Sequence, residues 1–291
     1  MKKFLIQFAL YALLFLVLNV ILYGISYYIL NKALFKLPES KTVLVIGDST
    51  TECAVNDTIF SASENVSQSG TAYIYSYVKL NRFLEENKHI KLVLLSIHAG
   101  TLMADDWVYG ATSLNEKAPQ YVYLFGKDEY CTLGKKSAFY SGMLKMPLTE
   151  INTITKSILR NIITYKDLRI GKYRKLEGTH LNNQTGNVHS AVFEENKLST
   201  PQVVYLKKII DLCKEKNVEV VLITTPMYGA KPNDRLNRYL NKNFQDITYL
   251  DYSAKNFPDE YYFDVDHLNY KGAEIFSKEI MMDIDTLFSE K

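Results

Sequence analysis

The stretch TVLVIGDSTTECAVND, residues 42–57, joins a strand-like segment to a tight turn. Its first part is apolar and largely β-branched, as a buried strand is, and it runs directly into the tight turn Gly47-Asp48-Ser49-Thr50. In an open parallel sheet, ligands bind just past the carboxyl ends of the strands. A turn needs no serine at its apex, so the stretch raises the question whether another part of the chain supplies a base for Ser49.

The chain after this stretch alternates apolar runs with helical patterns, which predicts an α/β fold built on a parallel sheet. Strands are expected at residues 42–46, 91–96, 218–224 and 247–250. Amphipathic helices, with apolar side chains three and four residues apart, are expected at residues 72–87, 202–216 and 272–288. Residues 101–200 fit this alternation poorly, and we interpret them as an insertion that is partly helical near residues 150–164.

The composition is that of a folded and nearly neutral chain. Of its 291 residues, 47% are hydrophobic and 23% are charged, which favours one large domain. The net charge of +2 comes from 34 basic and 32 acidic residues spread along the chain, and this argues against nucleic acid as a partner. Three widely spaced cysteines predict neither a disulfide framework nor a metal site.

The most apolar segment is FLIQFALYALLFLVLNVILYGISYYIL, residues 4–30, which contains no charged side chain. At about 1.5 Å per residue, a helix of this length exceeds a bilayer core of about 30 Å. We therefore expect residues 1–40 to be a membrane anchor with a short linker, and residues 41–291 to be the α/β domain. The alternatives are a buried core helix and a cleaved signal peptide.

The orientation of the anchor is predicted from the short segment that precedes the span. Lysines are nearly balanced on the two sides of residues 4–30, so charge counting alone does not decide it. Only three residues precede the span, which is typical of a signal anchor. This predicts a single-pass membrane protein whose bulk lies outside the cytoplasm, in the periplasm or the extracellular space.

Residues suited to acyl transfer follow the ends of the expected strands. A serine hydroxyl becomes a nucleophile when a positioned imidazole removes its proton, and a carboxylate fixes the tautomer of that imidazole. Ser49, His267 and Asp264 supply these three groups, and a spacing of three places Asp264 and His267 on one side of a turn. The backbone N–H groups of Ser49 and Gly70 are the expected donors to an oxyanion.

At these residues the sequence resembles the SGNH, or GDSL-like, hydrolase superfamily, which includes polysaccharide O-acetyltransferases. VLVIGDST is similar to the first block of the family, VSQSG to the second and DVDH to the last, while VVLITTP resembles the strand that precedes the last block. The resemblance covers residues 42–291 apart from the insertion, and it implies a three-layer, flavodoxin-like α/β fold.

The resemblance also implies roles for single residues. Ser49 is the nucleophile, Asp264 and His267 complete the triad, and Gly70 is an oxyanion donor. The third block of the family carries Gly-x-Asn-Asp, but this chain has Ser96-Ile97-His98-Ala99, so His98 takes the place of the oxyanion asparagine. A neutral histidine donates one hydrogen bond, with a reach different from that of an amide.

The function implied by this resemblance is that of a membrane-anchored serine acyl-ester hydrolase or O-acyltransferase. Its substrate would be an acyl-bearing glycan or similar ester of the cell envelope, with a membrane acyltransferase as partner and with no cofactor. Whether water or a sugar hydroxyl resolves the acyl-enzyme is left open by the sequence. Asp48 and Asp266 are the carboxylates expected to support the site.

Two other functions remain open. The first is a non-catalytic SGNH-fold scaffold or binding protein of an envelope assembly pathway, which the substitution at His98 favours. The second is a metal-dependent phosphoesterase using Asp48, Asp264, Asp266 and His267, because hard cations prefer clustered carboxylates.

Overall fold

The structure is a computed structural model that describes residues 1–29, 34–145, 170–181 and 191–289. Its centre is a parallel sheet of five strands in the order β2-β1-β3-β4-β5. The strands are β1 (Val43–Ile46), β2 (Ser63–Asn65), β3 (Leu92–Ser96), β4 (Glu219–Thr224) and β5 (Thr248–Asp251). This is the flavodoxin-like order, in which the connections diverge on either side of the boundary between β1 and β3.

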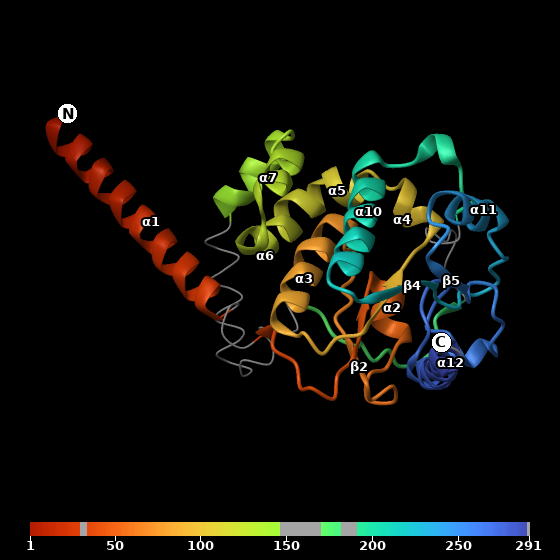
Figure 1. Ribbon diagram of the computed structural model, residues 1–291. Coiled ribbons are helices and arrows are strands. Elements are labelled where there is room, and N and C mark those ends of the chain that lie inside the picture. The colour runs from red at the N-terminus through yellow and green to blue at the C-terminus, as the bar shows by residue number, and fades with distance from the viewer. Residues whose placement is uncertain (30–33, 146–169, 182–190, 290–291) are drawn as a thin grey trace.

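Helices cover both faces of the sheet, so the predicted three-layer α/β fold is confirmed (Figure 1). Alternate residues of a strand point to opposite faces. Leu44 and Ile46 of β1 pack with α3 (Tyr73–Glu86) and α10 (Thr200–Glu215), while Val43 and Val45 pack with α12 (Tyr270–Ser289). Strands buried on both faces explain why β1 and β3 read as continuous apolar runs.

A group of short helices follows β3 and covers the first part of the region that we interpret as an insertion. They are α4 (Ala99–Met103), α5 (Asp106–Tyr109), η2 (Ser113–Lys117), α6 (Ala118–Tyr121), η3 (Val122–Leu124) and α7 (Lys127–Leu133). Leu114, Tyr121 and Leu133 are buried in the core that contains α3 and α10. The helix expected near residues 150–164 lies outside the described residues.

The carboxyl-terminal half adds shorter elements to this frame. They are η5 (Glu195–Lys197), α11 (Asp234–Asn243) and η6 (Asp259–Tyr261). Residues 170–181 lie against the sheet domain in an extended course, since Arg174 N donates to Glu52 O (2.8 Å) and Tyr270 N donates to Leu176 O (2.9 Å).

The amino-terminal helix α1 (Lys2–Ile29) is long and apolar enough to cross a membrane. Its candidate span, Lys2–Leu22, has a mean hydropathy of 2.5, and 6% of the tested window is buried. This assignment of a possible span rests on the length and composition of the helix.

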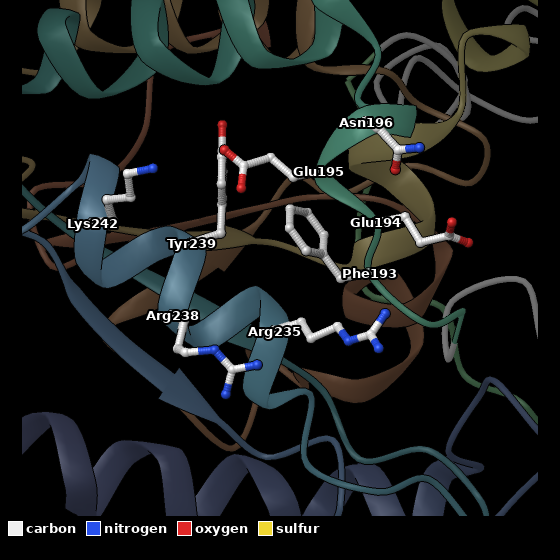
Figure 2. Close-up of a pocket in the computed structure, with 8 residues that line it drawn as sticks. All are labelled: Phe193, Glu194, Glu195, Asn196, Arg235, Arg238, Tyr239 and Lys242. Atoms are coloured by element: carbon white, nitrogen blue, oxygen red, sulfur yellow. The ribbon is translucent and has the colours of Figure 1, made fainter.

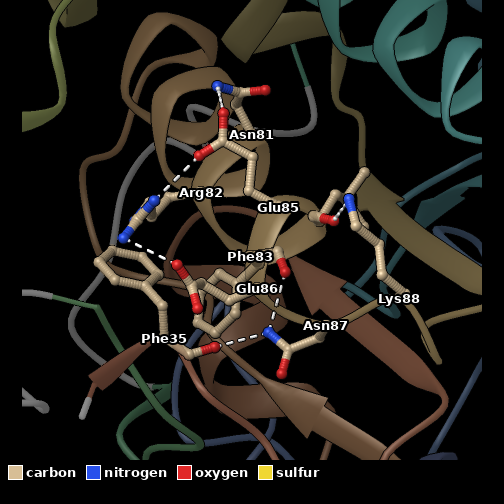
Figure 3. A network of polar contacts seen from close by, with 9 residues as sticks. Phe35, Asn81, Arg82, Phe83, Glu85, Glu86, Asn87 and Lys88 are labelled. Carbon is tan, nitrogen blue, oxygen red and sulfur yellow. Dashed lines mark hydrogen bonds and ion pairs between the residues drawn. The ribbon is translucent and has the colours of Figure 1, made fainter. Parts of the chain in front are cut away.

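The chain packs into the α/β domain soon after this helix. Leu34, Phe35 and Leu37 are buried in the main core. The Asn87 side chain accepts a hydrogen bond from Leu37 N (2.7 Å) and donates to Phe35 O (2.6 Å) and Phe83 O (2.8 Å), as Figure 3 shows in part. The boundary expected near residue 41 stays a prediction, but the core includes side chains that precede it.

Candidate active site

The turn after β1 holds Ser49 at the carboxyl edge of the sheet. A Cβ on Gly47 would lie 2.3 Å from the Cβ of Ser96, so only glycine allows β1 and β3 to approach here. Asp48 caps the six-residue helix α2 (Ser49–Ala54), because its Oδ1 accepts hydrogen bonds from Thr50 N (3.0 Å) and Thr50 Oγ1 (2.8 Å). Ser49 is therefore the first residue of the helix that follows the strand.

The structure brings Ser49 together with Asp264 and His267, which lie more than 200 residues later in the chain. His267 Nε2 lies 2.9 Å from Ser49 Oγ, and His267 Nδ1 lies 2.8 Å from Asp264 Oδ1. An ionised carboxylate only accepts hydrogen bonds, so Nδ1 carries the proton in a neutral His267 and Nε2 can accept the proton of Ser49. The arrangement has the connectivity of a Ser-His-Asp triad.

The loop 261–269 fixes the acid and the base. Asp264 Oδ1 also accepts hydrogen bonds from the backbone N–H groups of Asp266 and His267, both at 2.9 Å. Asn269 donates to Glu260 O (2.7 Å) and to Gly178 O (3.1 Å), which ties this loop to residues 170–181. Both side chains of the pair are thus held by the fold before any substrate arrives.

The Asp264 and His267 pair shifts the pKa values of its members in opposite directions. Burial opposes the charged form of His267, but the hydrogen bond and charge of Asp264, with weaker contributions from Asp266 and Asp48, raise its pKa above the usual value. Burial likewise opposes ionisation of Asp264, but the hydrogen bond from His267 and the nearby N–H groups lower its pKa overall. Asp264 is therefore ionised at neutral pH.

The loop that carries Gly70 is tied to the element that carries Ser49. Gln68 N donates to Gly47 O (3.0 Å), and Ser69 Oγ donates to the carboxylate of Glu52, one helical turn after Ser49. Gly70 itself has a φ of +62°, a conformation that favours glycine. Its expected contribution to an oxyanion hole stays a prediction.

His98 contacts the nucleophile turn through Thr50. Its side chain is 1% exposed, and its Nε2 lies 2.9 Å from Thr50 Oγ1. Because Thr50 gives its only hydroxyl proton to Asp48, it accepts from His98, which assigns a proton to Nε2. The role expected for His98 as an oxyanion donor stays a prediction, since this geometry gives its Nε2–H to Thr50.

The predicted carboxylates differ in what they contact. Asp48 accepts from Thr50 and, through Oδ2, from Thr101 Oγ1 (3.2 Å). The backbone N–H of Asp266 donates a hydrogen bond to Asp264 Oδ1, and the charge of Asp266 helps to raise the pKa of His267. Among the described residues no three His, Cys, Asp or Glu side chains are grouped so that they could hold a metal ion, so the donor set for the phosphoesterase alternative is not assembled there.

A hollow of about 530 Å³ lies away from these residues, between η5 and α11 (Figure 2). Its walls include Phe193, Glu195, Arg235, Arg238, Tyr239 and Lys242. This hollow could not be predicted from the sequence, because its walls come from segments that become neighbours only in the folded chain.

Comparisons with known proteins give distant matches. Nine chains of solved structures match. One is a crystal structure from Bacteroides fragilis NCTC 9343 described as a "putative acylhydrolase", at 12% identity, covering 88% of this chain and 93% of that chain with a TM-score of 0.42. A family model whose description names no activity matches residues 175–289. No curated protein matches the chain.

Proposed function

We propose that this chain is a serine acyl-ester hydrolase or O-acyltransferase in which Ser49, His267 and Asp264 form the catalytic triad. The observation that supports the proposal most directly is the line of contacts from Ser49 Oγ to His267 Nε2 at 2.9 Å and from His267 Nδ1 to Asp264 Oδ1 at 2.8 Å. Such a nucleophile, base and orienting carboxylate serve acyl transfer on many unrelated folds.

In the first half-reaction, Ser49 Oγ attacks the acyl carbon of the ester while His267 Nε2 takes the hydroxyl proton. The imidazolium that forms is stabilised by the Asp264 carboxylate. The carbonyl oxygen becomes an oxyanion, for which we assign the backbone N–H groups of Ser49 and Gly70 as donors. Collapse of this intermediate breaks the ester C–O bond, and His267 returns its proton to the departing alcohol.

In the second half-reaction, His267 takes a proton from an incoming hydroxyl as that hydroxyl attacks the acyl-enzyme. The acyl carbon leaves Ser49, and the proton of His267 passes to the Ser49 oxygen. Water as the attacking group gives hydrolysis, and a sugar hydroxyl gives O-acyl transfer. The same three residues serve both outcomes, so the acceptor decides between them.

We propose further that helix α1 anchors the enzyme in a membrane, with residues 41–291 outside the cytoplasm acting on an esterified glycan or similar ester of the cell envelope. A membrane acyltransferase is the partner that would supply acyl groups in a transfer pathway. The length and apolar composition of α1 support the anchor. The resemblance to a superfamily that includes polysaccharide O-acetyltransferases supports the substrate class.

The test of the triad is intact-mass labelling of the full chain in detergent with a small organophosphonate that reacts with activated serines. We expect one adduct on the parent protein and none on Ser49→Ala or His267→Ala. Ser61→Ala, which removes an exposed hydroxyl of the same domain, is the matched control and keeps the adduct. A folded parent protein without any adduct would favour a non-catalytic scaffold.

A further inference from the structure

Three hollows adjoin along one side of the carboxyl-terminal half, and we call them together the α11 groove. Their volumes are about 490, 470 and 530 Å³. The first two share Gly229, and the last two share Arg235 and Arg238. Because neighbouring hollows share wall residues, the groove is elongated and suits a chain-like ligand better than a single small molecule.

One end of the α11 groove is connected to the loop that contains the acid and the base of the proposed triad. Its first hollow is lined by Tyr228, and Tyr228 N donates a hydrogen bond to Val265 O at 3.0 Å. Val265 lies between Asp264 and His267 in the sequence. From there the groove passes along α11 and ends near Lys242.

The helix beside the groove presents a row of cations. Leu236, Tyr239 and Leu240 are buried and hold α11 against the domain. Arg235, Arg238 and Lys242 are exposed, and their spacing of three and four places them on one side of the helix, over about 10 Å of its length. Lys231, also exposed, lines the middle hollow just before the helix.

These cations are available to a ligand. Among the described residues, none of Lys231, Arg235, Arg238 and Lys242 forms an ion pair. Across the hollow, the Glu194 carboxylate is paired instead with Lys197 (2.7 Å), which lowers the negative charge on that wall. Figure 2 shows the two arginine side chains extending from α11. A guanidinium offers a planar fork of N–H donors that matches a carboxylate or a phosphate.

The opposite wall supplies groups of a different kind. Glu195 and Asn196 line the 530 Å³ hollow from η5, and they can accept hydrogen bonds from hydroxyl groups. Asp234 and Asp259, both exposed, line the other two hollows, so acceptors lie along the whole groove. An elongated groove with a row of cations on α11 and with interspersed hydrogen-bond acceptors matches a polymer that carries both acidic groups and hydroxyls.

We propose that the α11 groove binds an acidic polysaccharide, which presents an ester on the same polymer to Ser49. The acidic groups of the polymer pair with Lys231, Arg235, Arg238 and Lys242. This inference names the substrate class of the proposed function, and the ester step rests on that function. Binding in the groove does not require a working Ser49.

Two other anionic partners fit the groove less well. A lipid surface is disfavoured because Figure 1 shows α11 and the candidate membrane helix α1 at opposite ends of the molecule. Single-stranded nucleic acid binds by stacking its bases on aromatic side chains. Among the described residues, Phe193 and Tyr239 of the 530 Å³ hollow are only 2% and 8% exposed, and Tyr228 of the first hollow is the one lining aromatic residue that is more than one-third exposed, so the groove offers no row of rings for successive bases.

The experiment measures binding of polygalacturonate fragments to the full chain in detergent by isothermal titration calorimetry. The double variant Arg235→Glu/Arg238→Glu is expected to raise Kd about tenfold or more, and to weaken the salt dependence of binding. The matched control, Lys127→Glu/Lys135→Glu, changes the net charge equally at two exposed positions near α7 and is expected to leave Kd unchanged. Neutral dextran should not bind the parent protein.

Several outcomes would overturn the groove proposal: no binding of polygalacturonate by the parent protein, equal losses in both double variants, or tighter binding of anionic vesicles or single-stranded DNA through the same arginines. Turnover of a small aryl acetate is measured in parallel. If the parent protein does not turn it over, the proposed function fails while the groove result stands. If Arg235→Glu/Arg238→Glu keeps this turnover and loses polymer binding, both proposals are supported.

Discussion

His267 lies between a hydroxyl and a carboxylate, and this position determines how its protonation controls the proposed reaction. The base must be neutral to take the Ser49 proton, and Asp264 raises the pKa of His267 above its usual value of 6.5. We therefore expect kcat/KM for a small ester to be low in acid and to rise as the pH passes through this raised pKa.

Asp264→Asn tests the origin of that pH dependence. The amide keeps the size of the side chain but removes the charge that favours the imidazolium, so the inflection should move to lower pH. Because the tautomer of His267 is then no longer fixed, kcat should fall by about 10²- to 10⁴-fold. Asp259→Asn, an exposed change near the same loop, should alter neither quantity. An unchanged inflection in Asp264→Asn would contradict the assignment.

Lys79 binds two backbone carbonyl groups and makes the free energy of unfolding depend on pH. It is fully buried, and its Nζ donates to Val66 O (2.5 Å) and Ile170 O (2.7 Å), which joins the strand-end loop to residues 170–181. Burial lowers the pKa of Lys79 to about 7 from 10.5. Between these values the unfolded chain binds more protons than the folded chain, so this group makes the free energy of unfolding rise with pH.

Lys79→Met removes that titration. We expect the stability of the parent protein relative to Lys79→Met to grow between pH 7 and pH 9, by on the order of 1 kcal/mol per pH unit. Urea unfolding followed by circular dichroism at several pH values measures the difference. For Lys91→Met, at an exposed lysine, the free energy of unfolding should change with pH in the same way as that of the parent protein. A constant difference between the parent protein and Lys79→Met would contradict the depressed pKa.

At the scale of elements, helix α3 holds the segment that follows the candidate membrane helix. The Asn87 side chain makes three hydrogen bonds with backbone groups of Leu37, Phe35 and Phe83, and the rings of Phe35 and Phe83 meet edge to face at 4.9 Å (Figure 3). Asn87→Ala leaves buried N–H and C=O groups without partners, so we expect a loss of about 2–4 kcal/mol.

Asn81→Ala provides a control on the same helix, because Asn81 is partly exposed and its side chain donates to the exposed Glu85. We expect it to change the free energy of unfolding by less than about 0.5 kcal/mol. Urea unfolding of both variants in detergent compares them directly. Equal effects would mean that the bonds of Asn87 add little to the packing of Phe35.

The elements that the sequence predicted well are those with a strong apolar period. The four expected strands agree with β1, β3, β4 and β5 to within about one residue. Burial on both faces makes β1, β3 and β4 apolar, whereas β5 is partly exposed. Strand β2 was missed because Ser63–Asn65 is short and polar, and its pairing with β1 defines it instead. Helix α11 was missed because most of its side chains are polar, and only Leu236, Tyr239 and Leu240 are buried.

At the scale of the whole molecule, the residues of the candidate triad could be predicted from the sequence, because their chemistry depends on residue type and on their order along the chain. The contacts around the candidate triad could not be predicted from the sequence. The contact of His98 with Thr50 depends on how β1 and β3 lie side by side, and the α11 groove depends on residues 193–196 meeting α11. Such contacts between distant segments leave no periodic signal in the sequence.

The packing of the whole molecule also bears on where the α/β domain begins. Leu34, Phe35 and Leu37 lie before the boundary expected near residue 41, but their side chains are buried with those of α3. Burying such a side chain contributes about 1.5–3 kcal/mol. A chain that begins at residue 41 would lose all three and would also leave Asn87 without two of its partners. It should therefore be several kcal/mol less stable than a chain that begins at residue 34.

Thermal unfolding of the two truncated chains, without detergent, measures this difference. We expect residues 34–291 to remain in solution and to keep the organophosphonate adduct on Ser49, because the apolar helix α1 is absent and the core is complete. Residues 41–291 should melt at least about 10 °C lower, since each kcal/mol shifts the melting temperature of a domain of this size by roughly 2–4 °C. Equal melting temperatures would mean that residues 34–37 belong with the anchor, as the sequence alone predicts.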